Sequence, residues 1–476
     1  MPRSILGIGG LNPWNILLVV TVFSWMLHKQ RENLHWDMPK NINTLLVLQF
    51  LLLTIGFLRI FFDNAGLEEI KALREHGFNF PTGVSLWNAY FINTLKWIIP
   101  GLLLFHGCNS RSRLYMAIFS LLAMYLILSV LVYNAVPPWK IIDVDSLSKY
   151  AIKLDTRVGY HRVDLSAMLA GASWALFSSI ILVKKGWQQV GLLIAGGMII
   201  LGQALTGGRT GYMAWCLMGL FLGIFRWRKL LIVMPLILFL LLAFIPQVSD
   251  RIMVGFNTED EIVSSETEMD VKTLTAGRDG IWDLALDQFR EAPVFGHGRL
   301  AILRTGVNRQ AIENLGEAFG HPHSAYIEQL IDNGILGLSI ILLFYLALVR
   351  KSFSLLRDKT NPLFVAVGGM ALAMILVQLI TSLTAQSFYP RQGVVGMWCA
   401  IGLMLRVYVE REKAKQSDTT ILLWENTKET KNTTHEKQNR KHRRKTPPRL
   451  HHGSQLLRLN PADSSSGRSL ANRHGG

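Results

Sequence analysis

Cysteine and charged side chains are scarce in this chain. Only three of the 476 residues are cysteine, and Asp, Glu, Lys and Arg together make up 17%. The cysteines are widely spaced and form no Cys-x-x-Cys pair, which argues against a disulfide framework and against a thiolate metal site. A chain with so little charge and 50% hydrophobic residues is not disordered as a whole. The composition is typical of a membrane protein.

Long apolar runs recur along the chain. A helix needs about 20 apolar residues to cross a bilayer. Eleven runs approach that length: 12–28, 42–62, 84–106, 114–136, 165–183, 189–206, 210–225, 230–247, 335–349, 362–384 and 393–409. The sequence therefore predicts an all-α, polytopic membrane protein with 11 or 12 transmembrane helices.

The net charge of +16 is unevenly distributed. From Arg411 to the end there are 15 basic and 6 acidic residues, and the short loops after alternate apolar runs are basic too. Basic loops stay in the cytoplasm. The cations therefore indicate topology, and we predict a disordered cytoplasmic tail and no nucleic-acid partner. Binding of the tail to anionic headgroups or to RNA is the alternative.

The outward face is expected to carry one large loop. Residues 246–334 hold 15 acidic and 7 basic residues, and residues 277–289 have apolar positions at helical spacing. Long loops without an obvious structural task are usually functional. We divide the chain into an N-terminal helical bundle (1–245), this loop with its amphipathic helix (246–334), C-terminal helices (335–410) and the tail (411–476).

Three cations stand where the topology disfavours them. Arg209 lies among glycines in the stretch ALTGGRTGY at the outer boundary, Arg278 opens the amphipathic helix, and Lys96 lies inside the third apolar run. Ionisable groups at such places suggest a functional site, and a guanidinium matches phosphate geometry. The alternatives are a snorkelling Arg209 and a local salt bridge of Arg278 with Asp279.

Two histidines close the outer loop. His321 and His323 precede the helical sequence SAYIEQLIDNGILGL. A histidine can act as general base towards a hydroxyl group. A metal site would need a third ligand such as His297, and the spacing matches no zinc pattern. The remaining alternative is that these histidines have a purely structural role. No Walker A loop, HExxH, GxSxG or dinucleotide-binding fingerprint occurs in a usable context.

These motifs together resemble the O-antigen ligase and polymerase superfamily. The closest match is His323-Ser324 followed, after nine residues, by Gly334-Ile335-Leu336-Gly337. It is similar to the ligase signature of His-Asn/Ser, nine residues and Gly-x-x-Gly. The resemblance covers roughly residues 165–405. Ligases of this kind usually have twelve spans with both ends in the cytoplasm, whereas eleven runs place the N-terminus outside.

The resemblance implies a function as well as a fold. The fold would be GT-C-like, in a bacterial (Gram-negative) inner membrane with the active site facing the periplasm. The protein would be an O-antigen ligase that transfers a glycan from undecaprenyl diphosphate to a hydroxyl of lipid A-core, without metal or other cofactor. The alternatives are a polymerase of the same superfamily, a protein O-oligosaccharyltransferase and an anion transporter.

The resemblance also assigns roles to residues. Carried onto this sequence, His323 matches the catalytic histidine, and Arg209 and Arg278 match the two diphosphate-binding arginines. Four further residues are expected in the surrounding shell or in contact with substrate: His321, Lys96, Tyr326 and Glu328.

Overall fold

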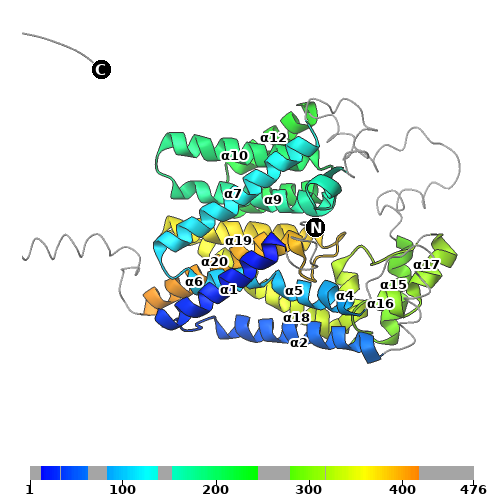
Figure 1. Ribbon diagram of the computed structural model, residues 1–476. Coiled ribbons are helices and arrows are strands. Elements are labelled where there is room, and N and C mark those ends of the chain that lie inside the picture. The colour runs from blue at the N-terminus through cyan, green and yellow to red at the C-terminus, as the bar shows by residue number, and fades with distance from the viewer. Residues whose placement is uncertain are drawn as a thin grey trace, which may run out of the picture. The chain divides into compact units, whose positions relative to one another are not determined.

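The computed structural model describes residues 12–32, 34–62, 83–137, 153–244, 279–316 and 318–416 (Figure 1). Throughout these ranges the regular elements are helices, and no strand occurs. The predicted all-α class is therefore confirmed. The tail from residue 417, Arg278 and residues 245–277 of the outer loop lie outside the described residues.

Seven helices in the described ranges are long and apolar enough to cross a membrane: α2 (Lys40–Phe62), α7 (Arg111–Ala135), α9 with η4 (Arg162–Leu182), α10 (Gly186–Leu205), α18 (Ala325–Leu356), α19 (Pro362–Thr381) and η5 with α20 (Gln392–Lys415). A shorter apolar helix, α11, spans Arg209–Phe225. The chain is therefore a multi-pass membrane protein.

All eleven predicted apolar runs fall on helices. The first lies on α1 (Pro13–Arg31) and the eighth on α12 (Leu230–Phe244). The third is broken into α4 (Val84–Trp87), the π-helix η2 (Asn88–Ile92), α5 (Asn93–Lys96) and α6 (Ile99–Gly107). Pro100 lies at the start of α6, where its missing N–H costs no helical hydrogen bond, and a proline disfavours helix in the residue before it.

Helices α9 and α19 form the centre of the bundle. In α19, 78% of the most apolar stretch is buried, and in α9 72%, against 22% in α2. Small side chains allow their close approach, since a methyl group added at Gly171 would lie 3.2 Å from the Met374 backbone. Both helices are therefore enclosed by protein, whereas α2 exposes most of its surface.

The connecting segments predicted to share the cytoplasmic side meet at one end of the helices. Glu32, after α1, binds Arg113 at 2.6 Å, and Asp37 binds Arg406 of α20 at 2.7 Å. Asp358, after α18, pairs with the same stretch of α20. The hydrogen bond from Arg113 lowers the pKa of Glu32 to about 2. We call this the basic end and the opposite one the site end.

Three short helices pack together at the site end. They are α15 (Asp279–Glu291), α16 (Ala301–Arg304) and α17 (Val307–Leu315), and Figure 1 shows them beside α18. The predicted amphipathic helix is present as α15. Its buried side chains Ile281 and Ala285 share an apolar cluster with Phe57 of α2 and Leu86 of α4. This cluster anchors the described part of the outer loop to the bundle.

Helix α18 differs from its prediction. It begins at Ala325, ten residues before the expected start of the apolar run, and its first three turns carry buried polar side chains. The helical path is interrupted at Gly334, where φ is 66° and ψ is −169°. The hydropathy pattern detects only the part after this break, because the part before it is polar.

Candidate functional site

The predicted general base, His323, lies in a tight turn before α18. Its backbone φ is 54°, a left-handed conformation that is uncommon outside glycine. Its N–H donates to His321 Nδ1 at 3.1 Å, and the two ring centroids are 4.2 Å apart. Trp282 of α15 donates from Nε1 to the Pro322 carbonyl at 2.7 Å. Both histidines are half-buried, so the turn is fixed while the imidazoles stay accessible.

Ser324 and Tyr326 attach the start of α18 to the end of α19. Ser324 caps the helix, since its hydroxyl accepts from the Ile327 N–H, and the Ala325 N–H donates to the Ser382 carbonyl at 2.9 Å. The Tyr326 hydroxyl donates to the Leu379 carbonyl at 2.9 Å. From the sequence, Tyr326 is expected in the surrounding shell or in contact with substrate, and the structure places its hydroxyl on the backbone of α19.

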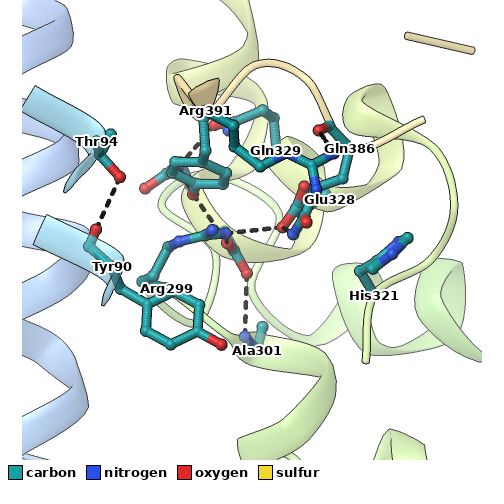
Figure 2. Close-up of polar contacts among 12 residues, drawn as sticks. Tyr90, Thr94, Arg299, Ala301, His321, Glu328, Gln329, Gln386 and Arg391 are labelled. Atoms are coloured by element: carbon teal, nitrogen blue, oxygen red, sulfur yellow. Dashed lines mark hydrogen bonds and ion pairs between the residues drawn. The ribbon is translucent and has the colours of Figure 1, made fainter. Parts of the chain in front are cut away.

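One turn further along α18, Glu328 joins a buried polar network (Figure 2). Glu328 Oε1 accepts from the Arg299 guanidinium at 2.7 Å and from the Gln386 side-chain amide. Arg299 also donates to Asp332 Oδ2 at 3.1 Å, and the Tyr389 hydroxyl donates to the same oxygen at 2.8 Å. The network thus ties α18 to the segment before α16 and to the loop after α19.

The ionisable groups of this network are two carboxyl groups, one guanidinium and one phenol. Burial alone would lower the pKa of Arg299, but Glu328 and Asp332 raise it above its ordinary value. Burial and the neighbouring Asp332 raise the pKa of Tyr389 well above the ordinary range. Arg299 is therefore charged and Tyr389 neutral at any physiological pH. Glu328 Oε2 is buried and has no hydrogen-bond partner.

The Gly-Ile-Leu-Gly sequence of α18 forms the break in that helix. Where the path is interrupted at Gly334, the Ile335 N–H donates to the Pro293 carbonyl at 2.9 Å. On the other side of the break the Gly298 N–H donates to the Asp332 carbonyl at 2.7 Å. The segment after α15 therefore hydrogen-bonds directly to the broken helix. The nine residues between Ser324 and Gly334 form about 2.5 helical turns between the histidine turn and this docking point.

Arg209 opens α11 at the site end. The preceding Gly207 has φ of 69°, and the Gly208 carbonyl accepts from Ser166 Oγ at 3.1 Å. A methyl group at Gly211 would collide with Ser166, so glycine is needed for this close approach of α11 to α9. Arg209 is half-buried, and its helix starts against the first turns of α9.

A chain of contacts leads from the start of α9 to the histidine turn. Asp164 lies 3.9 Å from Arg391, which donates to the Gln386 carbonyl. The Gln386 side chain in turn reaches Glu328, five residues beyond His323. The start of α11, which carries Arg209, and the turn that carries His323 are therefore connected through the loop after α19.

The other predicted site residues are not all part of this arrangement. Lys96 Nζ lies 3.3 Å from Asn15 Oδ1 of α1 and 4.5 Å from the ring of Trp97. The structure thus places Lys96 against α1. Arg278 lies outside the described residues. Among the described residues, no group of three or more His, Cys, Asp or Glu side chains could hold a metal ion.

Sequence reasoning missed the residues that complete the network. Arg299, Asp332, Gln386 and Tyr389 are buried or half-buried and bind one another or Glu328. One signal was available, because Asp332 follows Glu328 by four residues on a helix that enters an apolar run. Nothing local in the sequence connects Arg299 or Tyr389 to that pair.

The family comparison matches the part of the chain that holds the histidine turn. Residues 191–342 match the family model of the O-antigen ligases. This segment of the chain is similar to the O-antigen ligases. This match confirms the resemblance, and the matched segment includes Arg209, His323 and the break at Gly334. A comparison with curated proteins finds no match.

The matched segment does not include every element that packs around the histidine turn. The match begins in α10 and ends in α18, so α9, α19 and the loop bearing Gln386, Tyr389 and Arg391 lie beyond it. These elements nevertheless pack on the histidine turn and on Glu328. The matched segment and helices on both sides of it in the sequence therefore meet at the site.

Proposed function

We propose that this protein is an O-antigen ligase that transfers a glycan from undecaprenyl diphosphate to a hydroxyl group of lipid A-core. The observation that carries the proposal is the position of His323. It lies within the matched domain, in a turn fixed by His321 and Trp282, directly before the broken helix α18. A half-buried imidazole on a rigid support is well suited to remove a proton from a bound hydroxyl group.

The proposed reaction is a single displacement. The imidazole of His323 accepts the proton of the acceptor hydroxyl, and the oxygen attacks the anomeric carbon of the donor sugar. A new carbon–oxygen bond forms while the bond from the anomeric carbon to the diphosphate oxygen breaks, with inversion. Undecaprenyl diphosphate leaves with the electron pair of that bond.

Two guanidinium groups are assigned to the leaving diphosphate. Arg209 and Arg278 would stabilise the negative charge that develops on it, as planar donors suited to phosphate oxygens. This assignment makes a divalent cation unnecessary. The position of Arg209 at the start of α11, beside the first turns of α9, supports its share of the role.

We place the reaction at the periplasmic face of a Gram-negative inner membrane. The histidine turn and the start of α11 lie at the site end, and the basic segments gather at the other end. Basic loops favour the cytoplasm. The lipid carrier can then reach the site sideways from the outer leaflet.

A purified-component assay tests the proposal. The protein is incubated with carrier-linked glycan, lipid A-core and a chelator, and glycosylated lipid A-core is measured. We expect product in the presence of chelator, loss of product in His323→Ala, and full product in His35→Ala, an exposed histidine at the basic end. Undiminished transfer by His323→Ala would exclude the mechanism.

A polymerase of the same superfamily is the second candidate, because the donor chemistry is shared and only the acceptor differs. A deletion strain separates the two. Carrier-linked polymer that accumulates without reaching lipid A-core indicates a ligase, and single repeat units on the core indicate a polymerase. A protein O-oligosaccharyltransferase would instead leave periplasmic proteins without glycan, and an anion transporter would show no transfer in the purified assay.

A further inference from the structure

A small pocket opens between α9, α19 and the loop that follows α19. Its polar lining comes from Asp164 on α9, from Gln378 and Thr381 on α19, and from three residues of the loop: Gln386, Ser387 and Arg391. The proposed displacement reaction does not involve this pocket. All of its lining residues lie outside the segment shared with the O-antigen ligase family.

The pocket adjoins the histidine turn. The Ser382 carbonyl, next to the lining residue Thr381, accepts from the Ala325 N–H two residues after His323. The side chain of Gln386 donates to Glu328 Oε1, and Glu328 Oε2 is buried without a partner. The elements that line the pocket therefore contact the first turn of α18, which follows His323 directly.

The charged groups of the pocket retain binding capacity. Asp164 and Arg391 are 3.9 Å apart, at the limit of an ion pair, and their side chains are 32% and 43% exposed. An ion pair so long and so open contributes little to stability. The carboxylate can still accept hydrogen bonds and the guanidinium can still donate them.

The mixture of groups selects the class of ligand. Asp164 beside Arg391 disfavours a phosphate or carboxylate, because the ligand would meet a like charge. The amide and hydroxyl groups of Gln378, Thr381 and Gln386 disfavour an apolar occupant. Sugar hydroxyls donate and accept hydrogen bonds, and they match a set that offers both.

The cavity volume is about 20 Å³, which admits a single hydroxyl group but not a sugar ring. We propose that this pocket binds one hydroxyl group at the edge of a sugar that takes part in the transfer, and that Asp164 and Arg391 are specificity-determining residues. The inference rests on the proposed function. The sugar belongs either to the acceptor core or to the donor glycan.

Steady-state kinetics of the full-length protein test whether the pocket binds a sugar and which substrate that sugar belongs to. Asp164→Asn and Arg391→Met are compared with Glu32→Gln, which breaks an ion pair of similar exposure at the basic end. We expect the KM of one substrate to rise about tenfold in both pocket variants, as for loss of a hydrogen bond to a charged group. A rise in the acceptor KM assigns the pocket to lipid A-core, and a rise in the donor KM assigns it to the carrier-linked glycan.

A binding measurement completes the test. Oligosaccharide released from lipid A-core is titrated into detergent-solubilised protein, and the rise in Tm is recorded for the wild type and both variants. Unchanged KM for both substrates in variants that retain the wild-type Tm would overturn the pocket. Absence of transfer by the wild type itself would instead overturn the proposed function. If one variant fails to fold, the other still decides the question.

Discussion

The guanidinium carbon of Arg299 lies 3.3 Å from the centroid of the Tyr389 ring, and both side chains bind Asp332 Oδ2. A cation over an aromatic face is attracted by the ring quadrupole, more strongly when water is excluded. The two residues are 90 positions apart in the sequence. A single buried cation therefore holds the loop after α19 against the segment that precedes α16.

Replacement of Arg299 is expected to cost stability first and activity as a consequence. In Arg299→Leu the carboxyl groups of Glu328 and Asp332 lose their only ion-pair partner among the described residues. Removing one side of a buried ion pair typically costs about 3–5 kcal/mol. We expect a large fall in Tm in detergent, measured by thermal unfolding.

The matched control is Arg290→Leu. Arg290 pairs with Asp287 on α15, where both side chains are more than 60% exposed, so its ion pair should contribute little. The Tm of this variant should stay close to the wild-type value. Equal Tm values for the two variants would show that the buried network does not support the fold.

Local patterns predicted the helices and the position of the two histidines before a helix. Each apolar run falls on a helix, because the length of an apolar run is a local property. From the sequence, Gly334 is recognised only as part of the Gly-x-x-Gly signature, and no break in the helix is predicted. Its φ of 66° and its contact with the Pro293–Val294 backbone belong to the folded chain and have no local signal.

The network around Glu328 could not be predicted in the same way. Arg299 occurs in a loop sequence and Tyr389 in a short connection, and neither stands out by hydropathy. They meet only because α18, α19 and the segment after α15 pack together. Partners of buried charges are determined by tertiary packing, which composition and spacing do not specify.

His321 is expected to act by positioning His323. The His323 N–H donates to His321 Nδ1 at 3.1 Å, which helps to hold a left-handed turn. In His321→Ala we expect kcat to fall about tenfold, as for the loss of one hydrogen bond. The KM of the donor should not change. Steady-state kinetics with carrier-linked glycan measure both constants.

Rescue distinguishes positioning from a merely structural role. His321→Asn keeps a side-chain acceptor near the position of Nδ1, so its kcat should recover towards the wild-type value, whereas the Tm of both variants should be similar. If His321→Ala and His321→Asn are equally impaired, the hydrogen bond to His323 is not the cause.

Gly334→Ala is expected to disrupt the break in α18. The backbone conformation, with φ of 66° and ψ of −169°, is one that only glycine adopts readily, and a methyl group there would collide with the Val294 carbonyl. We expect a large loss of folded protein in detergent extracts and no transfer. Gly191→Ala on α10 is the control, because nothing lies within 4 Å of its added methyl group. Comparable yields of the two variants would contradict the close docking of the segment after α15.

The loss of folding stability at acidic pH should depend in part on Asp37. Burial alone would raise the pKa of Asp37, but hydrogen bonds from Arg406 and Lys413 lower it below the ordinary value of 3.8. A carboxyl group whose pKa is lower in the folded state stabilises the fold above its unfolded pKa, and this contribution disappears as the pH falls through the folded pKa. Asp37→Asn should therefore be less stable than the wild type at pH 7, by about 1 kcal/mol for a partly exposed pair. The Tm difference should shrink progressively below about pH 4.

A pH series of thermal unfolding for both proteins measures this effect. Asp287→Asn provides the baseline, since Asp287 is 67% exposed and its pair with Arg290 lies on the surface of α15. Its Tm should follow the wild type at every pH. A Tm difference for Asp37→Asn that is constant with pH would mean that Asp37 acts through shape and neutral hydrogen bonding. A difference that decreases on acidification shows that its charge joins the end of α20 to the segment between α1 and α2.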